Sequence, residues 1–401
     1  METLLPGLWR DMEAAGTRRT DVAADWAWYH YGVWKNRQPS GLTMYCQTRP
    51  FLEWHVRQRV RALANVELRD RSKVSGFLHD SSGKQVTGVS VRQRGEHSDC
   101  EERATLVVDC SGRGTRAPQW LEQLGYGRAA VEEVRTDVGY SSRIVRLRDD
   151  PTRDWQVMMV YPRAPRQTRV GYIFPVEDGC HIITLAGYCG DYPPTDEDGF
   201  HAFARSLPRP EYAQALEGAE VLTEIIPHRL PSNLRRRYEQ MDRFPDGLVI
   251  LGDAICSFNP LFGQGMTTAA KGAEALATCL DRHAGGDIRG LARTFQKQTV
   301  PYNDLAWTLA TTEDMRYLEV SGKRPIGLAA LNWYKNQLLE LASVDPDLNR
   351  RFLAVLTFTR GLSEILAPSV IVSCLRYGLS RRRQANVAQL SALPRRPVPA
   401  S

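Results

Sequence analysis

Apolar side chains recur at helical and strand spacing along the first hundred residues. In residues 49–63, Leu52, Val56, Val60 and Leu63 share one helical face and Pro50 sits in the first turn, so we expect an amphipathic helix. A second helix is expected at 4–15. The runs 73–78 and 86–92 flank a turn at 80–83 and predict a hairpin, while 66–68 predicts a short strand.

Two continuous apolar runs, 105–109 and 248–251, are typical of strands buried on both faces, as in parallel sheets. Between them lie four strand-like runs joined by short turns, which predict a mostly antiparallel sheet. These four runs are 138–148, 155–162, 169–175 and 181–187. Helices are expected at 200–206, 211–214, 265–283 and over most of 290–379.

This order predicts an α/β fold with an α+β insertion. An incomplete, Rossmann-like FAD/NAD(P)-binding domain is expected in two parts, 1–135 and 231–285. A substrate-binding sheet, 136–230, interrupts it, and a helical region, 286–380, and a disordered tail, 381–401, follow. A cofactor domain interrupted in this way creates a cleft, which is a common place for ligands.

Composition narrows the class of protein. The 401 residues are 42% hydrophobic and 24% charged, as in globular proteins, and the eight cysteines form no C-x-x-C pair. We therefore expect a cytoplasmic protein without a disulfide framework or a zinc site. The net charge of +6 fits attraction of an anionic cofactor, or simply an arginine-rich composition. No nucleic-acid motif is present. The apolar run 365–379 could touch a membrane or an apolar substrate, but a helix buried against the body is the commoner explanation, so membrane contact is not expected.

The segment 247–268, GLVILGDAICSFNPLFGQGMTT, carries the strongest functional indication. Asp253 follows a buried strand, where ligands bind in open α/β sheets, and its carboxylate can accept hydrogen bonds from sugar-like hydroxyls. Glycines allow the backbone to lie against a flat ring. The helix expected from Gly265 directs free N–H groups and a positive dipole end at the same place. The alternative is an ordinary strand–turn–helix with glycines at tight bends.

GDAICSFNPLFGQGM resembles the second FAD-binding motif of the class A flavoprotein monooxygenases, which have the para-hydroxybenzoate hydroxylase-like fold. LVVDCSGRGTRAPQWLEQLGY, residues 106–126, resembles their middle motif, and TRPFLE, residues 48–53, resembles the helix start that places an arginine near the flavin. The resemblance implies that Asp253 holds the ribityl chain of FAD. The cofactor-binding residues it implies are Arg49, Asp109, Gly112, Arg113, Gly252, Asp253, Pro260, Gly263, Gln264, Gly265 and Met266.

Three of these positions have simpler readings. Asp109 could simply be an N-cap after its strand. Arg113, like the nearby Arg116, could be solvated, and Arg49 could be an ordinary surface residue of its helix.

The family's first motif, G-x-G-x-x-G between a strand and a helix, does not occur in this sequence. We therefore expect the chain to begin after that βαβ unit, through a late start or a truncated gene, and its affinity for FAD to depend on the remaining motifs.

The resemblance implies a catalytic cycle. NADPH or NADH reduces FAD, a flavin C4a-hydroperoxide forms with O2, and one oxygen atom enters an aromatic ring or alkene of a small, secondary-metabolite-type substrate. Such a hydroxylase or epoxidase relies on its cofactor, and no catalytic acid or base is nominated. Candidates for the substrate wall, each also explicable as sheet core, are Tyr140, Met158, Tyr161, Tyr172 and Phe174.

Other activities share the fold. A flavin reductase would saturate isoprenoid-type double bonds without consuming oxygen. A halogenase needs Trp-x-Trp-x-Ile-Pro, whereas Trp26-Ala27-Trp28 continues as Tyr29-His30. A non-catalytic remnant or partner-binding module is the third alternative. The oligomeric state is left open.

Overall fold

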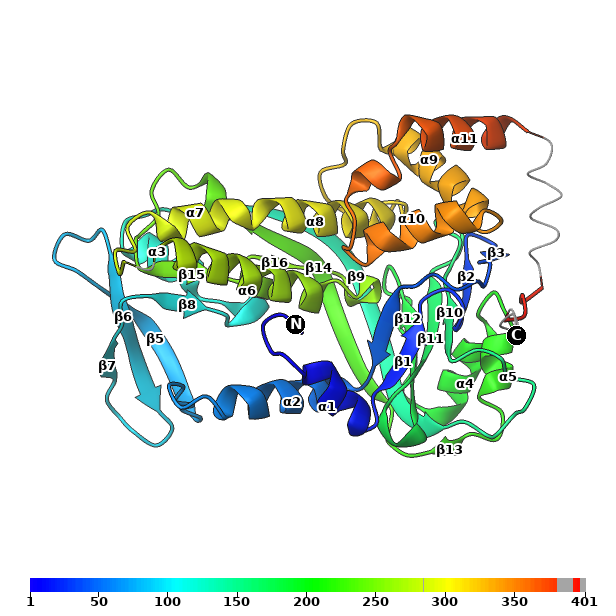
Figure 1. Ribbon diagram of the computed structural model, residues 1–401, viewed down its shortest axis with the longest axis horizontal. Helices are drawn as coiled ribbons and strands as arrows, with labels where there is room; N and C mark the ends of the chain where they lie inside the picture. The colour runs from blue at the N-terminus through cyan, green and yellow to red at the C-terminus, as the bar shows by residue number, and fades with distance from the viewer. Residues whose placement is uncertain (284, 381–391, 397–401) are drawn as a thin grey trace. The chain divides into compact units, whose positions relative to one another are not determined.

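The computed structural model describes residues 1–283, 285–380 and 392–396 (Figure 1). Within them the chain forms two compact units. The first, which we call the motif unit, holds Arg59–Arg135 and Ser232–Asp314 together with Met1. The second, the sheet unit, holds Glu2–Gln58, Thr136–Pro231 and the chain from Met315 onward.

The motif unit is built around a parallel strand pair, β8 (Val107–Asp109) and β15 (Leu248–Ile250). Val249 pairs with Val108 and Ile250 with Asp109. The sequence predicted both strands, but β8 is not buried on both faces, because the side chain of Val108 is 38% exposed. The other regular elements are β5 (Ser72–His79), β6 (Val86–Gln93), β7 (Cys100–Arg103), β16 (Cys256–Ser257), α3 (Ala117–Gln123), α6 (Gly265–Arg282), α7 (Leu291–Gln298) and α8 (Val300–Asp314).

The expected hairpin is confirmed as β5 and β6, which pair antiparallel, and β7 adds a third strand. No strand forms at 66–68, where the chain is irregular. The core of the unit lies where β15 meets α6 and α7: Val249, Cys279 and Phe295 are all fully buried there. This packing holds β15, whose end leads into the candidate site, against the C-terminal half of α6 and the first turns of α7.

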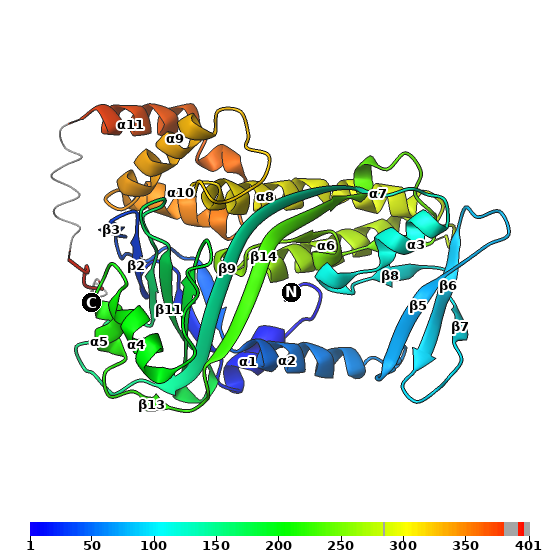
Figure 2. The ribbon, with the colours of Figure 1, turned by 180° about the vertical axis from the view of Figure 1, so that it is seen from behind.

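The sheet unit contains the antiparallel sheet that the sequence predicted. The strand order is β16-β14-β9-β12-β11-β10-β2-β3, with β13 paired to β9. Strands β9 and β14 run side by side (Figure 2) and contribute residues to both units. The strands are β2 (Trp26–His30), β3 (Val33–Trp34), β9 (Ala130–Arg146), β10 (Val157–Val160), β11 (Arg169–Pro175), β12 (His181–Gly187), β13 (Glu220–Val221) and β14 (Ile226–Arg237).

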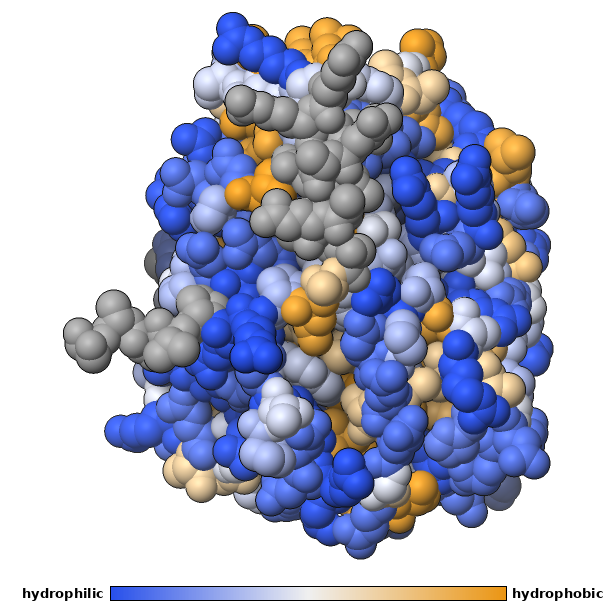
Figure 3. Space-filling model, turned by 90° about the vertical axis from the view of Figure 1, so that its right-hand side faces the viewer, coloured by the Kyte–Doolittle hydropathy of each residue, from blue (hydrophilic) through white to orange (hydrophobic). Residues whose placement is uncertain are grey.

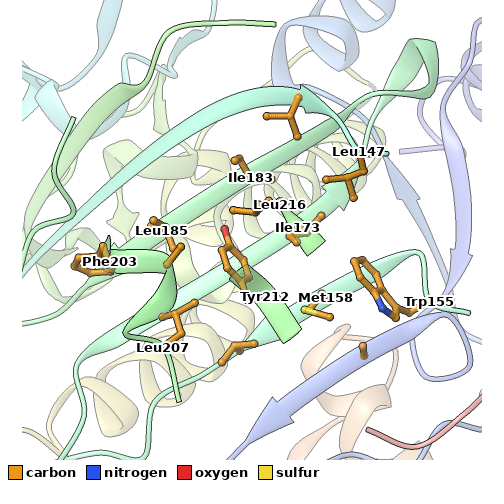
Figure 4. Close-up of a cluster of buried hydrophobic side chains, with 14 of the residues drawn as sticks. Leu147, Trp155, Met158, Ile173, Ile183, Leu185, Phe203, Leu207, Tyr212 and Leu216 are labelled. Carbon is orange, nitrogen blue, oxygen red and sulfur yellow. The ribbon is translucent and has the colours of Figure 1, made fainter. Parts of the chain in front are cut away.

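One face of this sheet packs on the short helices α4 (Glu197–Arg205) and α5 (Glu211–Ala215). Figure 4 shows Tyr212 and Phe203 from these helices among sheet residues such as Met158 and Ile183. Each of these four side chains is at most 3% exposed. Burial of this much apolar surface is the main force that holds the sheet together.

The division of the chain differs from the predicted one at both ends. Residues 2–58 were expected in the cofactor domain but belong to the sheet unit, because β2 pairs in parallel with β10. This N-terminal part also holds α1 (Leu8–Ala14), β1 (Arg18–Asp21), β4 (Thr43–Cys46) and the start of α2 (Arg49–Arg61).

The helical region also divides. Residues 286–314 belong to the motif unit, whereas α9 (Leu328–Leu341), α10 (Pro346–Leu356) and α11 (Pro368–Leu379) belong to the sheet unit. The tail expected from 381 lies outside the described residues, apart from 392–396.

Lys35 is buried in the sheet unit just after β3. Only 3% of it is exposed, and its ammonium donates hydrogen bonds to the Leu339 carbonyl and, at 3.0 Å, to Ser343 Oγ. Burial lowers the pKa of Lys35 to about 7, and the nearby Glu340 opposes this shift. The charged form is therefore disfavoured in the folded chain relative to the unfolded chain.

This burial predicts a rise of stability with pH. From about pH 7 to about pH 9 the unfolded chain binds more protons at Lys35 than the folded chain, so the free energy of unfolding should increase by about 2 kcal/mol from this residue. Urea unfolding of wild type and Lys35→Met at both pH values measures the difference. Identical pH dependence in the two proteins would contradict the lowered pKa.

Candidate functional site

Asp253 lies at the carboxyl end of β15, as the sequence predicted. The chain leaves the strand through a short turn, Gly252–Ala254, in which Gly252 has a φ of 66°. The Leu251 N–H donates to the Asp109 carbonyl at 3.0 Å and holds this turn beside the end of β8. Asp253 is exposed on the surface of the motif unit.

The Pro-x-x-Gly-x-Gly loop then leads into α6. Asn259 Oδ1 accepts the Leu261 N–H at 3.1 Å, and Gly263 follows with a φ of 65°. Helix α6, 18 residues long, begins at Gly265, and no side chain caps its first turn within the described chain. Its leading N–H groups and positive dipole end are therefore available to an anionic or polar ligand.

Two of the predicted positions, Gly265 and Gly112, lie close to the Asp253 side chain. A methyl group on Gly265 would lie 3.7 Å from Asp253 Oδ1, and one on Gly112 would lie 4.0 Å from Asp253 Cβ. Gln264 is 4% exposed, and its Oε1 accepts no hydrogen bond within the described part of the chain. Met266 is 55% exposed at the start of α6. The arrangement combines a carboxylate, a helix start and a buried amide oxygen.

Asp109 instead has a local role in the middle motif. Its Oδ1 accepts the Ser111 N–H at 2.9 Å, and its Oδ2 accepts the Thr115 hydroxyl. The carboxylate therefore closes the turn that follows β8. Asp109 is not the N-cap that the simpler reading expected, because Ser111 holds that position before the 3-10 helix Gly112–Gly114. A direct contact of Asp109 with the cofactor stays a prediction.

Arg113 is not solvated. Its guanidinium donates to the Ser232 carbonyl at 2.7 Å and to Ser257 Oγ at 2.9 Å, and burial lowers its pKa from the usual range. Arg236 donates in turn to the Arg113 carbonyl at 2.9 Å and to the Ala254 carbonyl at 3.2 Å. These two arginines link the middle motif to the segment that bears Asp253.

Arg49 and Arg116 both lie on the surface, and each contacts a residue near it in the sequence. The Arg49 guanidinium pairs with Glu53 at 2.7 Å, and both side chains are more than half exposed. Arg49 belongs to the sheet unit, so its role at the flavin stays a prediction. Arg116 is exposed, and its guanidinium lies 5.7 Å from the centroid of the Trp120 ring.

A buried polar network behind the loop was missed by sequence reasoning. Asn233, Asn259 and Asp314 are all fully buried. Asp314 accepts hydrogen bonds from Asn233 Nδ2 at 2.7 Å and from Asn259 Nδ2 at 2.9 Å, while the Asn259 N–H donates to Asn233 Oδ1 at 2.6 Å. The network anchors the loop before α6 to β14 and to the end of α8. Only Asn259 lies in a motif; nothing in the pattern connects it to the other two.

The predicted substrate wall divides between the two faces of the sheet, since side chains alternate along a strand. Met158 is 1% exposed and belongs to the core in Figure 4. Tyr161 and Tyr172 lie with ring centroids 5.4 Å apart, and Tyr140 lies beside His228. A surface groove of about 580 Å³ in this unit is lined instead by residues that include Arg143, Glu197 and 221–225.

Comparison with known proteins assigns the chain to a family. No protein-family model matches the sequence. Protein Rv3254 of Mycobacterium tuberculosis is 30% identical to the chain over 392 residues, which cover 94% of this chain and 81% of that protein. The chain belongs to the Rv3254 family. Among solved structures, the flavin-dependent brominase Bmp2 superimposes with a TM-score of 0.61 at 17% identity, covering 89% of this chain and 80% of the brominase.

A second similar structure is that of pqsL, a probable FAD-dependent monooxygenase from Pseudomonas aeruginosa. Its TM-score is 0.59 at 17% identity, with 78% of this chain and 84% of pqsL covered. These likenesses confirm the fold class predicted from the sequence: this member of the Rv3254 family has the mixed α/β fold of the class A flavin-dependent monooxygenases and halogenases, with a Rossmann-like core.

Proposed function

We propose that this chain binds FAD at Asp253 and the start of α6 and is an NAD(P)H-dependent monooxygenase. It would insert one oxygen atom of O2 into an electron-rich aromatic ring or alkene of a small organic molecule, by hydroxylation or epoxidation. The observation that carries the proposal is the convergence of Asp253, Gly112 and Gly265. The flavin-dependent neighbours support a flavin as the cofactor.

The residues at this site suit the ribityl and ring half of FAD. The exposed Asp253 carboxylate can accept hydrogen bonds from ribityl hydroxyls, and charge-assisted bonds of this kind are among the stronger ones. The uncapped N-terminus of α6 can stabilise negative charge at the N1–C2=O edge of a reduced flavin ring. The buried Oε1 of Gln264 offers an acceptor at the same helix start.

The bound flavin supplies the redox and oxygen chemistry, and the protein supplies binding, orientation and exclusion of water. No G-x-G-x-x-G is available for the pyrophosphate, so the fit rests on the second motif and on the turn at Gly112. A structure of PqsL holds 2-aminobenzoylacetate, which supports an aromatic substrate here. A monooxygenase should consume O2 in proportion to the substrate added, whereas an enzyme that reduces double bonds should not.

Asp253→Ala tests the site. Loss of a charged hydrogen-bond acceptor costs about 1.5–3 kcal/mol, so the Kd for FAD should rise roughly tenfold to a hundredfold. Quenching of FAD fluorescence on titration with protein measures this. Asp281→Ala is the matched control, because Asp281 is an exposed carboxylate at the other end of α6. Equal affinities for the Asp253 variant, the control and wild type would remove Asp253 from the site.

A further inference from the structure

The C-terminal part of the described chain consists of helix α11 and a short segment, residues 392–396. Helix α11 is buried along one face, where Val370 is 6% exposed, whereas Leu379 at its end is 86% exposed. The burial expected for 365–379 is therefore correct for one face only. None of the described helices is long and apolar enough to cross a membrane. The short segment has no regular secondary structure and belongs to the sheet unit (Figure 1).

One apolar side chain of the segment adds to the core of the sheet unit. Leu393 is partly buried and packs against the cluster that Figure 4 shows. Figure 3 shows the side of this unit on which the segment lies, and hydrophilic side chains predominate there. A segment held in one place loses conformational freedom, and the burial of one leucine offsets only part of this cost. The polar contacts of the segment therefore decide what holds it.

Asp25, just before β2, supplies a buried negative charge and is 5% exposed. Its Oδ2 accepts the Asp21 N–H at 2.7 Å, whereas its Oδ1 accepts no well-directed hydrogen bond within the described chain. The Arg396 guanidinium lies 2.9 Å from this Oδ1 and forms an ion pair with it. A buried carboxylate is costly unless a positive charge compensates it. Among the described residues, Arg396 of the segment is the one that pairs with Asp25.

Arg37, shortly after β3, has a fully buried side chain. Its guanidinium donates two hydrogen bonds to the Ala24 carbonyl, at 3.0 and 3.1 Å, and two to Asp154, at 2.5 and 2.6 Å. A fifth hydrogen bond, of 3.1 Å, goes to the Pro394 carbonyl. A guanidinium has five N–H donors, and a buried donor left without an acceptor is costly. The backbone of the segment therefore supplies the acceptor that completes the set.

Asp154, just before β10, joins the two halves of this arrangement. Its Oδ1 accepts from Arg37, and its Oδ2 accepts the Arg396 N–H at 2.7 Å. Although partial burial raises the pKa of Asp154, the hydrogen bonds from Arg37 and from the Arg396 N–H hold it below its usual range. Two carboxylates thus bind one arginine, Asp25 at the side chain and Asp154 at the backbone. They precede β2 and β10, which pair in parallel.

We propose that Asp25, Arg37 and Asp154 form a peptide-binding site, and that residues 393–396 occupy it as a ligand within the same chain. The site recognises a leucine followed three positions later by an arginine. Arg395, between them, is exposed and is not recognised. The bound segment acts as a latch that joins the C-terminal part of the chain to the beginnings of β2 and β10. The proposal is independent of the flavin site.

Peptide binding to the full chain tests this. In the double variant Leu393→Ser/Arg396→Ser the segment loses both of its anchoring side chains and should leave the site open. A fluorescently labelled, end-capped peptide, ALPRR, with the sequence of residues 392–396, should bind this variant in an anisotropy titration. It should bind the wild-type chain at least about tenfold more weakly, because the tethered segment competes at a high effective concentration.

Two altered peptides give a matched comparison. Arg396→Gln in the peptide should weaken binding to the double variant at least about thirtyfold, because Asp25 is then left without its counterion. Arg395→Gln removes the same charge from an exposed position and should change the affinity no more than about threefold.

Hydrogen exchange of the wild-type chain requires no variant. Relative to their intrinsic rates, the Arg396 amide should exchange at least about tenfold more slowly than the Arg395 amide, because it donates to Asp154. Equal protection of the two amides, equal binding of the two altered peptides, or equal binding of ALPRR by wild type and the double variant would overturn the proposal. So would the absence of ALPRR binding to a double variant shown to be folded by circular dichroism.

Discussion

Gly247→Ala is expected to lower the free energy of unfolding by about 4 kcal/mol, through backbone strain and overpacking together. Gly247 precedes β15 and has a φ of 75°, a conformation that disfavours a side chain. A methyl group there would lie 2.2 Å from the Val86 carbonyl oxygen, which belongs to backbone. The carbonyl of Gly247 also accepts the Val107 N–H at 2.8 Å, so a shift of Gly247 would disturb β8 as well.

Gly127→Ala separates the effect of backbone strain from the effect of overpacking. Gly127 has a φ of 81°, but nothing lies within 4 Å of the position that a methyl group would take. This variant should lose only the conformational part, about 1 kcal/mol. Urea unfolding followed by circular dichroism measures both. An equal loss of unfolding free energy in the two variants would show that Gly247 does not pack tightly against the Val86 carbonyl.

Asp314→Ala is expected to lower the free energy of unfolding by about 3 kcal/mol, because each buried donor left unpaired costs about 1–3 kcal/mol. Asp314 accepts hydrogen bonds from the side chains of both Asn233 and Asn259, and all three residues are fully buried. Since Asn259 also shapes the loop before α6, the variant should bind FAD more weakly if the proposed site is correct.

Two further variants define this prediction. Asp314→Asn keeps the size of the side chain and one oxygen acceptor, so its loss should be intermediate. Asp281→Ala removes an exposed carboxylate and should change the free energy of unfolding by no more than about 0.5 kcal/mol. An Asp314→Ala protein as stable as this control would contradict the anchoring role of the network.

The local sequence pattern predicted those strands that pair with a strand close to them in the sequence. The runs 169–175 and 181–187 became β11 and β12 with the predicted bounds, because alternating side chains and short turns define an antiparallel meander. The parallel pairing of β2 with β10 could not be predicted in this way, since it joins residues about 130 positions apart along the chain. Strand β14 was missed because its sequence, IPHRLPSNLRRR, is polar and contains two prolines.

The candidate site shows the same contrast. Asp253, Gly263 and Gly265 were predicted because their spacing has a direct physical use, and the structure brings the carboxylate to the start of α6. The partners of Asn259 could not be predicted, because Asn233 and Asp314 come from β14 and α8 and approach each other only in the folded chain. Polar residues buried in pairs leave no periodic pattern in the sequence.

The FAD site at Asp253 is tested by titrating the purified chain with FAD, with visible absorbance recorded and bound flavin separated from free flavin. We expect saturable binding of about one FAD per chain and a shifted flavin spectrum. Asp253→Ala should weaken this binding, and Asp281→Ala should not. Absence of any bound flavin at concentrations that saturate a folded flavoprotein, with the chain shown to be folded by circular dichroism, would contradict the proposed FAD site.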